Sequence, residues 1–132
     1  YRFVTVVDKS LGIRENGTSM NRVKNDLIEG SAVIDAAAFS SYDIAFVAGS
    51  GFDFLLFDTQ RASAEIKQLA SCISTMRGTE GVPSVRVGET RADQICWALD
   101  QDAKGIVVPM VNSARESEDM VRCCKCPFDG SS

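Results

Sequence analysis

The sequence contains no histidine, so it lacks both the commonest general base and the commonest metal ligand of proteins. No apolar run is long enough to span a bilayer, so no membrane partner is predicted. The net charge of −4 gives no electrostatic reason to expect a nucleic-acid partner. With 45% apolar and 24% charged residues, the 132-residue chain is predicted to be globular, with a substantial core.

The cysteines indicate a reducing compartment. There are five, an odd number, and no signal peptide is visible, so we expect free thiols in a cytoplasmic protein. The first residue is Tyr1 rather than methionine, which predicts a fragment or a processed product. Three of the cysteines form Cys123-Cys124-Lys125-Cys126. This spacing is not the usual Cys-x-x-Cys, so thiols at a helix end are favoured over a site for a soft metal.

The stretch from Gly51 to Arg61 organises the rest of the chain. Its apolar run, Phe54-Leu55-Leu56-Phe57, does not alternate, which is typical of a strand buried on both faces. In parallel sheets covered by helices, the loops after the C-terminal strand ends carry the chemistry. Asp58, Gln60 and Arg61 directly follow this run and are therefore candidate site residues.

Short apolar runs alternate with helical periodicity along the chain. Strands are predicted near Ala32–Ala38, Asp53–Asp58, Ser84–Val87 and Gly105–Val111. Helices are predicted from Ser19 to Gly30, after Ser40 or Ser41, from about Ser63 to Arg77, after Thr90, and after Asn112 or Ser113.

This alternation predicts an α/β fold with a parallel sheet and right-handed crossovers. A complete TIM (β/α)8 barrel needs about 250 residues, so about four βα units amount to a partial barrel. We assign residues 19–132 to this partial barrel and residues 1–18 to an N-terminal appendage.

A half-barrel leaves two open sheet edges, here near Ala32–Ala38 and Gly105–Val111. Unpaired apolar edges are templates for other strands, so we predict either a dimer or larger homo-oligomer or a chain that requires a complementary half. In the alternative arrangement, the β-prone segment Tyr1–Val7 folds back and covers one edge.

Three separated motifs resemble the HpcH/HpaI aldolase family, which includes the 2-oxo-acid aldolases and macrophomate synthase. They are Gly51-Phe-Asp-Phe-Leu-Leu-Phe-Asp58, Val85-Arg86-Val87, and Trp97-Ala-Leu-Asp100 leading to Gly105-Ile-Val-Val-Pro-Met-Val111. The resemblance implies the N-terminal half of a (β/α)8 barrel. It also implies a lyase in which a divalent metal (Mg, Mn or Co) holds pyruvate or oxaloacetate as an enolate, in an oligomer.

Two residues carry over from the family by position. Asp58 matches the acidic residue at the end of the second strand, and Arg86 matches the arginine that contacts the substrate's carboxylate or enolate oxygen. The chemistry of Arg86 supports this role independently, because a guanidinium forks onto a carboxylate and offsets developing oxyanion charge. The alternative is that Arg86 forms a structural bridge with Asp58.

The sequence departs from the family pattern at three places. Arg61 stands where the family has its acid/base histidine, and arginine cannot accept a proton. Asp102 stands where the family usually has glycine. The family's metal ligands would lie beyond Ser132. The resemblance therefore implies a metal-dependent aldolase whose isolated half is inactive. The alternative is a noncatalytic half-barrel that serves as a binding or assembly module.

Overall fold

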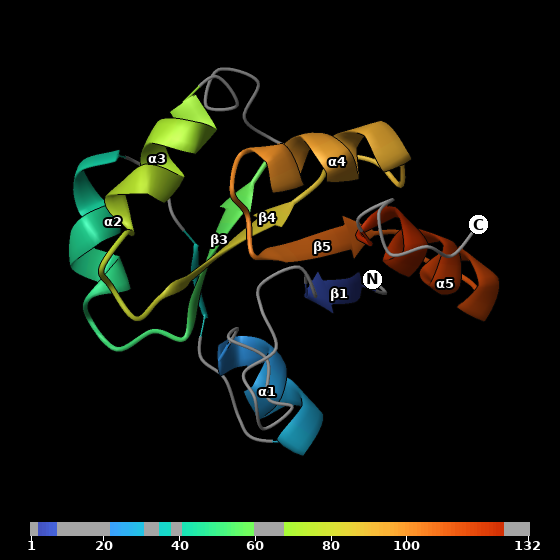
Figure 1. Cartoon of the computed structure of the whole chain (residues 1–132), viewed down its shortest axis with the longest axis horizontal. Helices are drawn as coiled ribbons and strands as arrows, with labels where there is room; N and C mark the ends of the chain where they lie inside the picture. Colours follow the sequence, from blue (N-terminus) through green and yellow to red (C-terminus); the bar gives the residue numbers. More distant parts are fainter. Residues whose placement is uncertain (1–2, 8–21, 31–34, 38–40, 60–67, 126–132) are drawn as a thin grey trace.

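The computed structural model describes residues 3–7, 22–30, 35–37, 41–59 and 68–125. They form one five-stranded sheet in the order β1-β5-β4-β3-β2, flanked by helices (Figure 1). In chain order the elements are β1 (Phe3–Val7), α1 (Arg22–Glu29), β2 (Asp35–Ala37), α2 (Ser41–Ala48), β3 (Phe54–Asp58), α3 (Leu69–Thr75), β4 (Val82–Arg86), α4 (Ala92–Asp100), β5 (Gly105–Pro109) and α5 (Ala114–Cys123).

The four strands from β2 to β5 are parallel neighbours in chain order. This confirms the predicted α/β architecture with a parallel sheet. The strand bounds differ by a few residues from those expected. β4 begins at Val82 rather than Ser84 and so includes Pro83, and β5 ends at Pro109 rather than Val111.

The core lies between the sheet and the helices α2 to α5. β3 contributes Leu55 and Phe57, β4 contributes Val85, and β5 contributes Ile106 and Val108, all buried in one apolar cluster. Their helical partners include Ile44, Ala48, Leu69, Ile73, Ile95 and Ala98. Helix α1 lies on the other side of the strands from α4 (Figure 1). Arg22 of α1 contacts Asp53, just before β3, so α1 is tied to the N-terminal end of the sheet.

Two helix boundaries have clear physical causes. Gly30 follows α1 with a φ of +75°, a left-handed conformation that ends a helix at little cost in glycine. Ser113 caps α5 by accepting a hydrogen bond from the Glu116 amide at 3.2 Å, while the Glu116 carboxylate accepts from the Asn112 amide at 2.8 Å.

The turn before β5 explains the departure at position 102. Asp102 has a φ of +72°, in the left-handed region that glycine adopts freely. Aspartate is among the residues that tolerate this region best. Its carboxylate pairs with Lys104 two residues later. Asp102 therefore adopts the conformation for which glycine is the usual choice.

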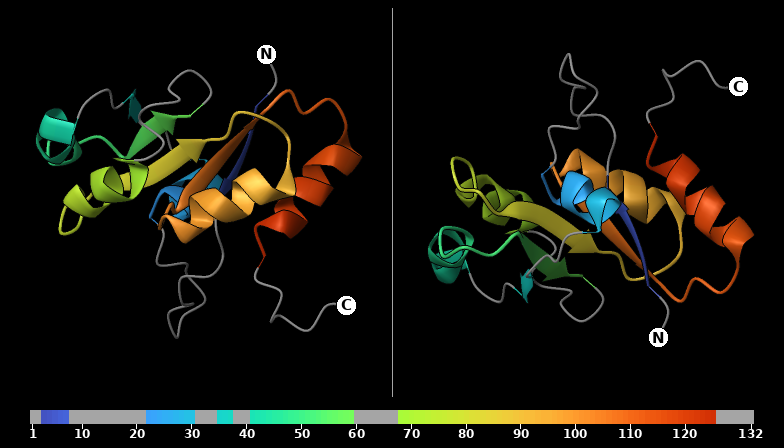
Figure 2. Two further views of the ribbon diagram at one scale, coloured as in Figure 1. Left: turned by 90° about the horizontal axis from the view of Figure 1, so that it is seen from above. Right: turned by 90° about the horizontal axis from the view of Figure 1, so that it is seen from below.

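The strand β1 holds the outer edge of β5. It runs antiparallel to β5, with Phe3 opposite Pro109 and Val7 opposite Gly105 (Figure 2). This is the arrangement that the sequence offered as the alternative to an open β5 edge. The division at residue 18 stays a prediction, although residues 3–7 belong to the same sheet as the barrel-like strands. Among the described residues, no helix is both long and apolar enough to cross a membrane.

Candidate functional site

Asp58 and Arg86 are the last residues of neighbouring parallel strands. The register of β3 and β4 places their Cα atoms opposite each other. Paired residues on adjacent parallel strands project from the same face of a sheet. Their face is opposite to that of Phe57 and Val85, which pack in the helix-covered core. The structure therefore brings these two predicted site residues together at the C-terminal end of the sheet.

The two side chains form a bidentate ion pair. The Arg86 Nε donates a hydrogen bond to the Asp58 Oδ1 at 2.9 Å, and the Arg86 Nη2 contacts the Asp58 Oδ2. The side chains of Arg86 and Asp58 are 19% and 33% exposed, so solvent screens this pair only partly. The bridge considered from the sequence is thus present. It also demonstrates that the guanidinium offers a forked face to a carboxylate at this strand end.

Thr59 fixes the backbone beneath this pair. Its amide donates to the Arg86 carbonyl at 3.1 Å, and its hydroxyl donates to the same oxygen at 2.8 Å. The ends of β3 and β4 are therefore held together by main-chain and side-chain contacts alike. Sequence analysis did not single out Thr59, because a threonine directly after a strand carries no distinctive signal for a bond to the next strand.

The loops after β4 and β5 are tied to each other at the same end of the sheet. The Thr90 hydroxyl donates to the Pro109 carbonyl at 2.9 Å, and the Asn112 Nδ2 donates to the Met110 carbonyl at 2.8 Å. Between these contacts Met110 adopts a φ of +59° and is 60% exposed. Thr90 was expected to cap the following helix, but the N-cap residue is Arg91 and the Thr90 hydroxyl binds across to β5 instead.

The structure describes only some of the other residues that the sequence singled out. Gln60, Arg61 and Cys126 lie outside the described residues. Cys124 is buried and Cys123 is half-buried at the end of α5. Burial raises the pKa of the Cys123 thiol above its usual value, and the nearby Cys96 and Asp119 add to this effect.

The described side chains do not fit a divalent metal. No group of three or more histidine, cysteine, aspartate or glutamate side chains comes together within the described ranges. Asp58, the strand-end carboxylate, is engaged by Arg86. Hard divalent cations need several oxygen ligands, so Asp58 by itself is an insufficient site.

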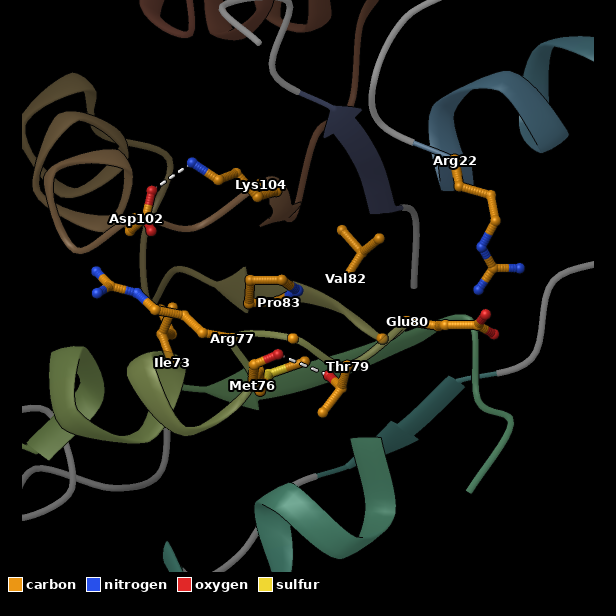
Figure 3. A pocket seen from close by; sticks show the side chains of 12 residues that line it. Arg22, Ile73, Met76, Arg77, Thr79, Glu80, Val82, Pro83, Asp102 and Lys104 are labelled. Carbon is orange, nitrogen blue, oxygen red and sulfur yellow. Dashed lines mark hydrogen bonds and ion pairs between the residues drawn. The ribbon is translucent and has the colours of Figure 1, made fainter. Parts of the chain in front are cut away.

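A cavity of about 300 Å³ lies at the opposite, N-terminal end of the strands (Figure 3). Its lining includes Arg22, Arg77, Val82, Pro83 and Lys104. Figure 3 shows Arg77 and Lys104 on one side of it and Arg22 and Glu80 on the other. Chemistry in barrels of this kind is located at the C-terminal strand ends, so this cavity is separate from the Asp58–Arg86 site.

Comparison with known proteins identifies the relatives of this chain. Residues 32–131 match the family model HpcH/HpaI aldolase/citrate lyase. The chain is 27% identical over 113 residues to a hydroxypyruvate/pyruvate aldolase of Roseobacter denitrificans, covering 84% of this chain and 44% of that protein. It is 31% identical over 114 residues to a 4-hydroxy-2-oxovalerate aldolase of Rhodococcus jostii, again covering 84% and 44%.

Solved structures agree with this relationship. An HpcH/HpaI aldolase/citrate lyase family protein from Burkholderia cenocepacia matches with a TM-score of 0.73 at 20% identity, which bears on the fold alone, and covers 83% of this chain and 45% of that one. The citrate synthase SbnG matches with a TM-score of 0.63 at 30% identity, covering 75% and 41%. The chain spans less than half the length of these relatives. Since the family model covers most of its residues, the chain belongs to the HpcH/HpaI aldolase/citrate lyase family.

Proposed function

We propose that this chain is the carboxylate-binding half of a carbon–carbon lyase, an aldolase that acts on a small 2-oxo acid such as pyruvate or oxaloacetate. The observation that carries the proposal is the forked contact of Arg86 with a carboxylate at a C-terminal strand end. The carboxylate of a 2-oxo acid has the same shape and charge as that of Asp58. It would therefore compete with Asp58 for the guanidinium or share it.

Arg86 would have two roles in such a reaction. It would orient the substrate through the carboxylate, and its positive charge would offset the negative charge that develops on the enolate oxygen. Thr59 would act as a positioning residue, because it holds the Arg86 carbonyl and hence the end of β4. Asp58 would occupy the guanidinium until the substrate carboxylate displaces it.

Other parts of the reaction must come from elsewhere. Arg61, at the family's base position, stays protonated and cannot accept the proton that enolisation releases. The divalent metal implied by the family (Mg, Mn or Co) finds no fitting set of ligands among the described residues. The isolated chain is therefore proposed to be inactive, and to work in the cytoplasm as part of a longer enzyme or of an oligomer.

A noncatalytic binding or assembly module is the second candidate. Two observations favour it: the closed Asp58–Arg86 pair and the strand β1 that covers the edge of β5. With β1 paired to β5, this edge offers no open backbone groups to other strands. The half-barrel could therefore be stable without catalysing a reaction.

Binding of pyruvate, measured by titration calorimetry or by ligand-observed NMR, tests the first candidate. Arg86→Gln should weaken binding roughly 10-fold to 100-fold, since charged hydrogen bonds contribute about 1.5–3 kcal/mol. Asp58→Asn should strengthen binding, because the competing carboxylate is gone. Arg91→Gln is a matched control: Arg91 is an exposed arginine that follows the same strand and pairs with Asp93. Equal binding by wild type and Arg86→Gln would reject the carboxylate-binding role and leave the assembly module.

A further inference from the structure

The cavity at the N-terminal ends of the strands lies around the start of β4 (Figure 3). β4 is a central strand with β3 and β5 as its neighbours, so the cavity does not depend on either edge of the sheet. Its volume of about 300 Å³ is at the lower end of the range of small-molecule sites. The apolar part of its lining is formed by Ile73, Met76, Val82 and Pro83. The cavity therefore has room for a ligand with only a few carbon atoms.

Three cationic side chains from different elements line this cavity. Arg22 comes from α1, Arg77 follows α3, and Lys104 precedes β5. Figure 3 shows that they approach the cavity from two sides. The lining also contains two carboxylates, Glu80 and Asp102, so three positive charges face two negative ones, although the whole chain has a net charge of −4. An anion at this position would therefore experience a net attraction.

The acidic neighbours do not engage all three cations. The Arg22 Nη1 contacts the Asp53 carboxylate, and the Lys104 ammonium contacts Asp102. Arg77 is exposed, and its side chain has no ion-pair or hydrogen-bond partner among the described residues. Its guanidinium is therefore available to a ligand, and its fork of donors matches the oxygen atoms of an oxyanion.

A buried backbone amide in the lining also lacks an acceptor. Along an extended strand, successive residues direct their backbone groups alternately to the two neighbouring strands. The Val82 amide donates to the Asp53 carbonyl on the β3 side at 2.9 Å. The preceding amide, of Gly81, is therefore directed to the β5 side, where the Lys104 amide donates to the Pro83 carbonyl at 2.8 Å. Gly81 is buried, and its amide has no acceptor among the described residues. A buried amide requires an acceptor, which an anion in the cavity would supply.

We propose that this cavity binds the phosphate group of a small organic phosphate through the Arg77 guanidinium, the Lys104 ammonium and the Gly81 amide. A phosphate has acceptor oxygens in several directions and suits donors from different elements, whereas a planar carboxylate suits a single fork. The apolar lining would pack against the carbon atoms of the ligand. The proposal does not depend on the aldolase activity, because the Asp58–Arg86 pair lies at the other end of the strands.

Phosphate titration followed by NMR provides the central test. Inorganic phosphate, glycerol phosphate and acetate are each added to the isotope-labelled full chain, with sodium chloride keeping the ionic strength constant. The Gly81 amide resonance should shift and reach saturation with both phosphates. Glycerol phosphate should bind more tightly than inorganic phosphate because its carbon atoms contact the apolar lining. Acetate should bind much more weakly than either, because it offers fewer oxygen atoms to the converging donors.

Substitutions in the lining separate this site from general surface charge and from the Asp58–Arg86 pair. Arg77→Gln should weaken phosphate binding about tenfold or more, because a charged hydrogen bond is lost. Glu80→Gln should strengthen binding, because a repelling carboxylate is removed. Arg115→Gln is a matched control, since Arg115 is an exposed arginine of α5 outside the cavity lining. Arg86→Gln should leave phosphate binding unchanged, and Arg77→Gln should leave pyruvate binding unchanged, so each site is tested separately.

Four outcomes would overturn the proposal. Equal phosphate binding by the wild type and Arg77→Gln would show that this guanidinium takes no part. A Gly81 amide resonance that stays in place at saturating phosphate would locate the anion elsewhere. Acetate binding as tight as phosphate binding would indicate a carboxylate site. Glycerol phosphate binding no tighter than inorganic phosphate would reject an organic ligand. If Arg77→Gln does not fold, the Gly81 shift in the wild type and the effect of Glu80→Gln decide instead.

Discussion

A side-chain carbon at Gly105 would lie 2.4 Å from the hydroxyl oxygen of Ser84, directly across the β4–β5 ladder. Ser84 is buried at 4% exposure and its Cβ would lie 3.2 Å from the same carbon, so neither strand has room to accommodate it. Glycine at the start of β5 is therefore what lets the two strands approach within hydrogen-bonding distance.

Gly105→Ala should destabilise the protein by about 1–3 kcal/mol, the usual cost of overpacking a tight site. Ser84→Ala removes the nearer of the two clashing atoms, so the double variant should recover part of this loss. Urea unfolding of the wild type, both single variants and the double variant gives the coupling free energy. Additive effects of the two substitutions would mean that the strands separate instead of clashing.

Met110 offers a test of backbone strain. Its φ of +59° lies in the left-handed region, which costs a residue with a Cβ about 1–2 kcal/mol. Met110→Gly should therefore be more stable than Met110→Ala by about 1 kcal/mol, although glycine is the more flexible residue when unfolded. Both variants remove the same exposed side chain, so their difference in thermal unfolding reports the strain. A more stable alanine variant would contradict it.

The isolated chain is predicted to have no catalytic activity of its own. We expect no oxaloacetate decarboxylation or aldol cleavage above the buffer rate with added magnesium, manganese or cobalt, measured as pyruvate formed. The physical reason is that arginine cannot act as the base and that no described carboxylate cluster can hold the metal. Arg61→His alone should not restore turnover. Turnover well above buffer that disappears in Arg86→Gln would refute this prediction.

The Cys123 thiol should titrate at a higher pH than an ordinary cysteine. Burial, Cys96 and Asp119 all disfavour its thiolate and raise its pKa, so alkylation by iodoacetamide should need a higher pH than for an ordinary cysteine. Mass spectrometry of each cysteine peptide across a pH series measures this. Cys96→Ser should lower the midpoint only slightly, because burial is the largest cause. The same raised pKa means that folded stability from this group is present at low pH and is lost as the pH rises through it.

The sequence predicted the parallel β2–β5 sheet because buried strands and amphipathic helices have distinct periodicities, and each strand pairs with its neighbour in the chain. It also placed Asp58 and Arg86 at strand ends, from which their meeting follows by register. Contacts that depend on backbone geometry could not be read in this way. Nothing in Pro109-Met110 signals a left-handed residue. The hydroxyl of Thr90 could serve a helix cap or a distant carbonyl equally well.

The pairing of β1 was harder to foresee for a different reason. Strand propensity reports that Tyr1–Val7 is extended, but it names no partner and no direction. The partner and the direction of β1 depend on which sheet edge stays unpaired after the parallel strands have formed. The local sequence of residues 1–7 does not contain that information.

The direction of β1 has a practical consequence for handling the protein. Phe3 lies opposite Pro109, so the start of the chain is directed to the same end of the sheet as Asp58 and Arg86. A purification tag fused before Tyr1 would therefore emerge beside the strand ends where pyruvate binding is to be measured. A tag placed after Ser132 leaves β1 unmodified. Comparing pyruvate binding by the two fusions would show whether the amino end of the chain obstructs the strand ends that carry Asp58 and Arg86.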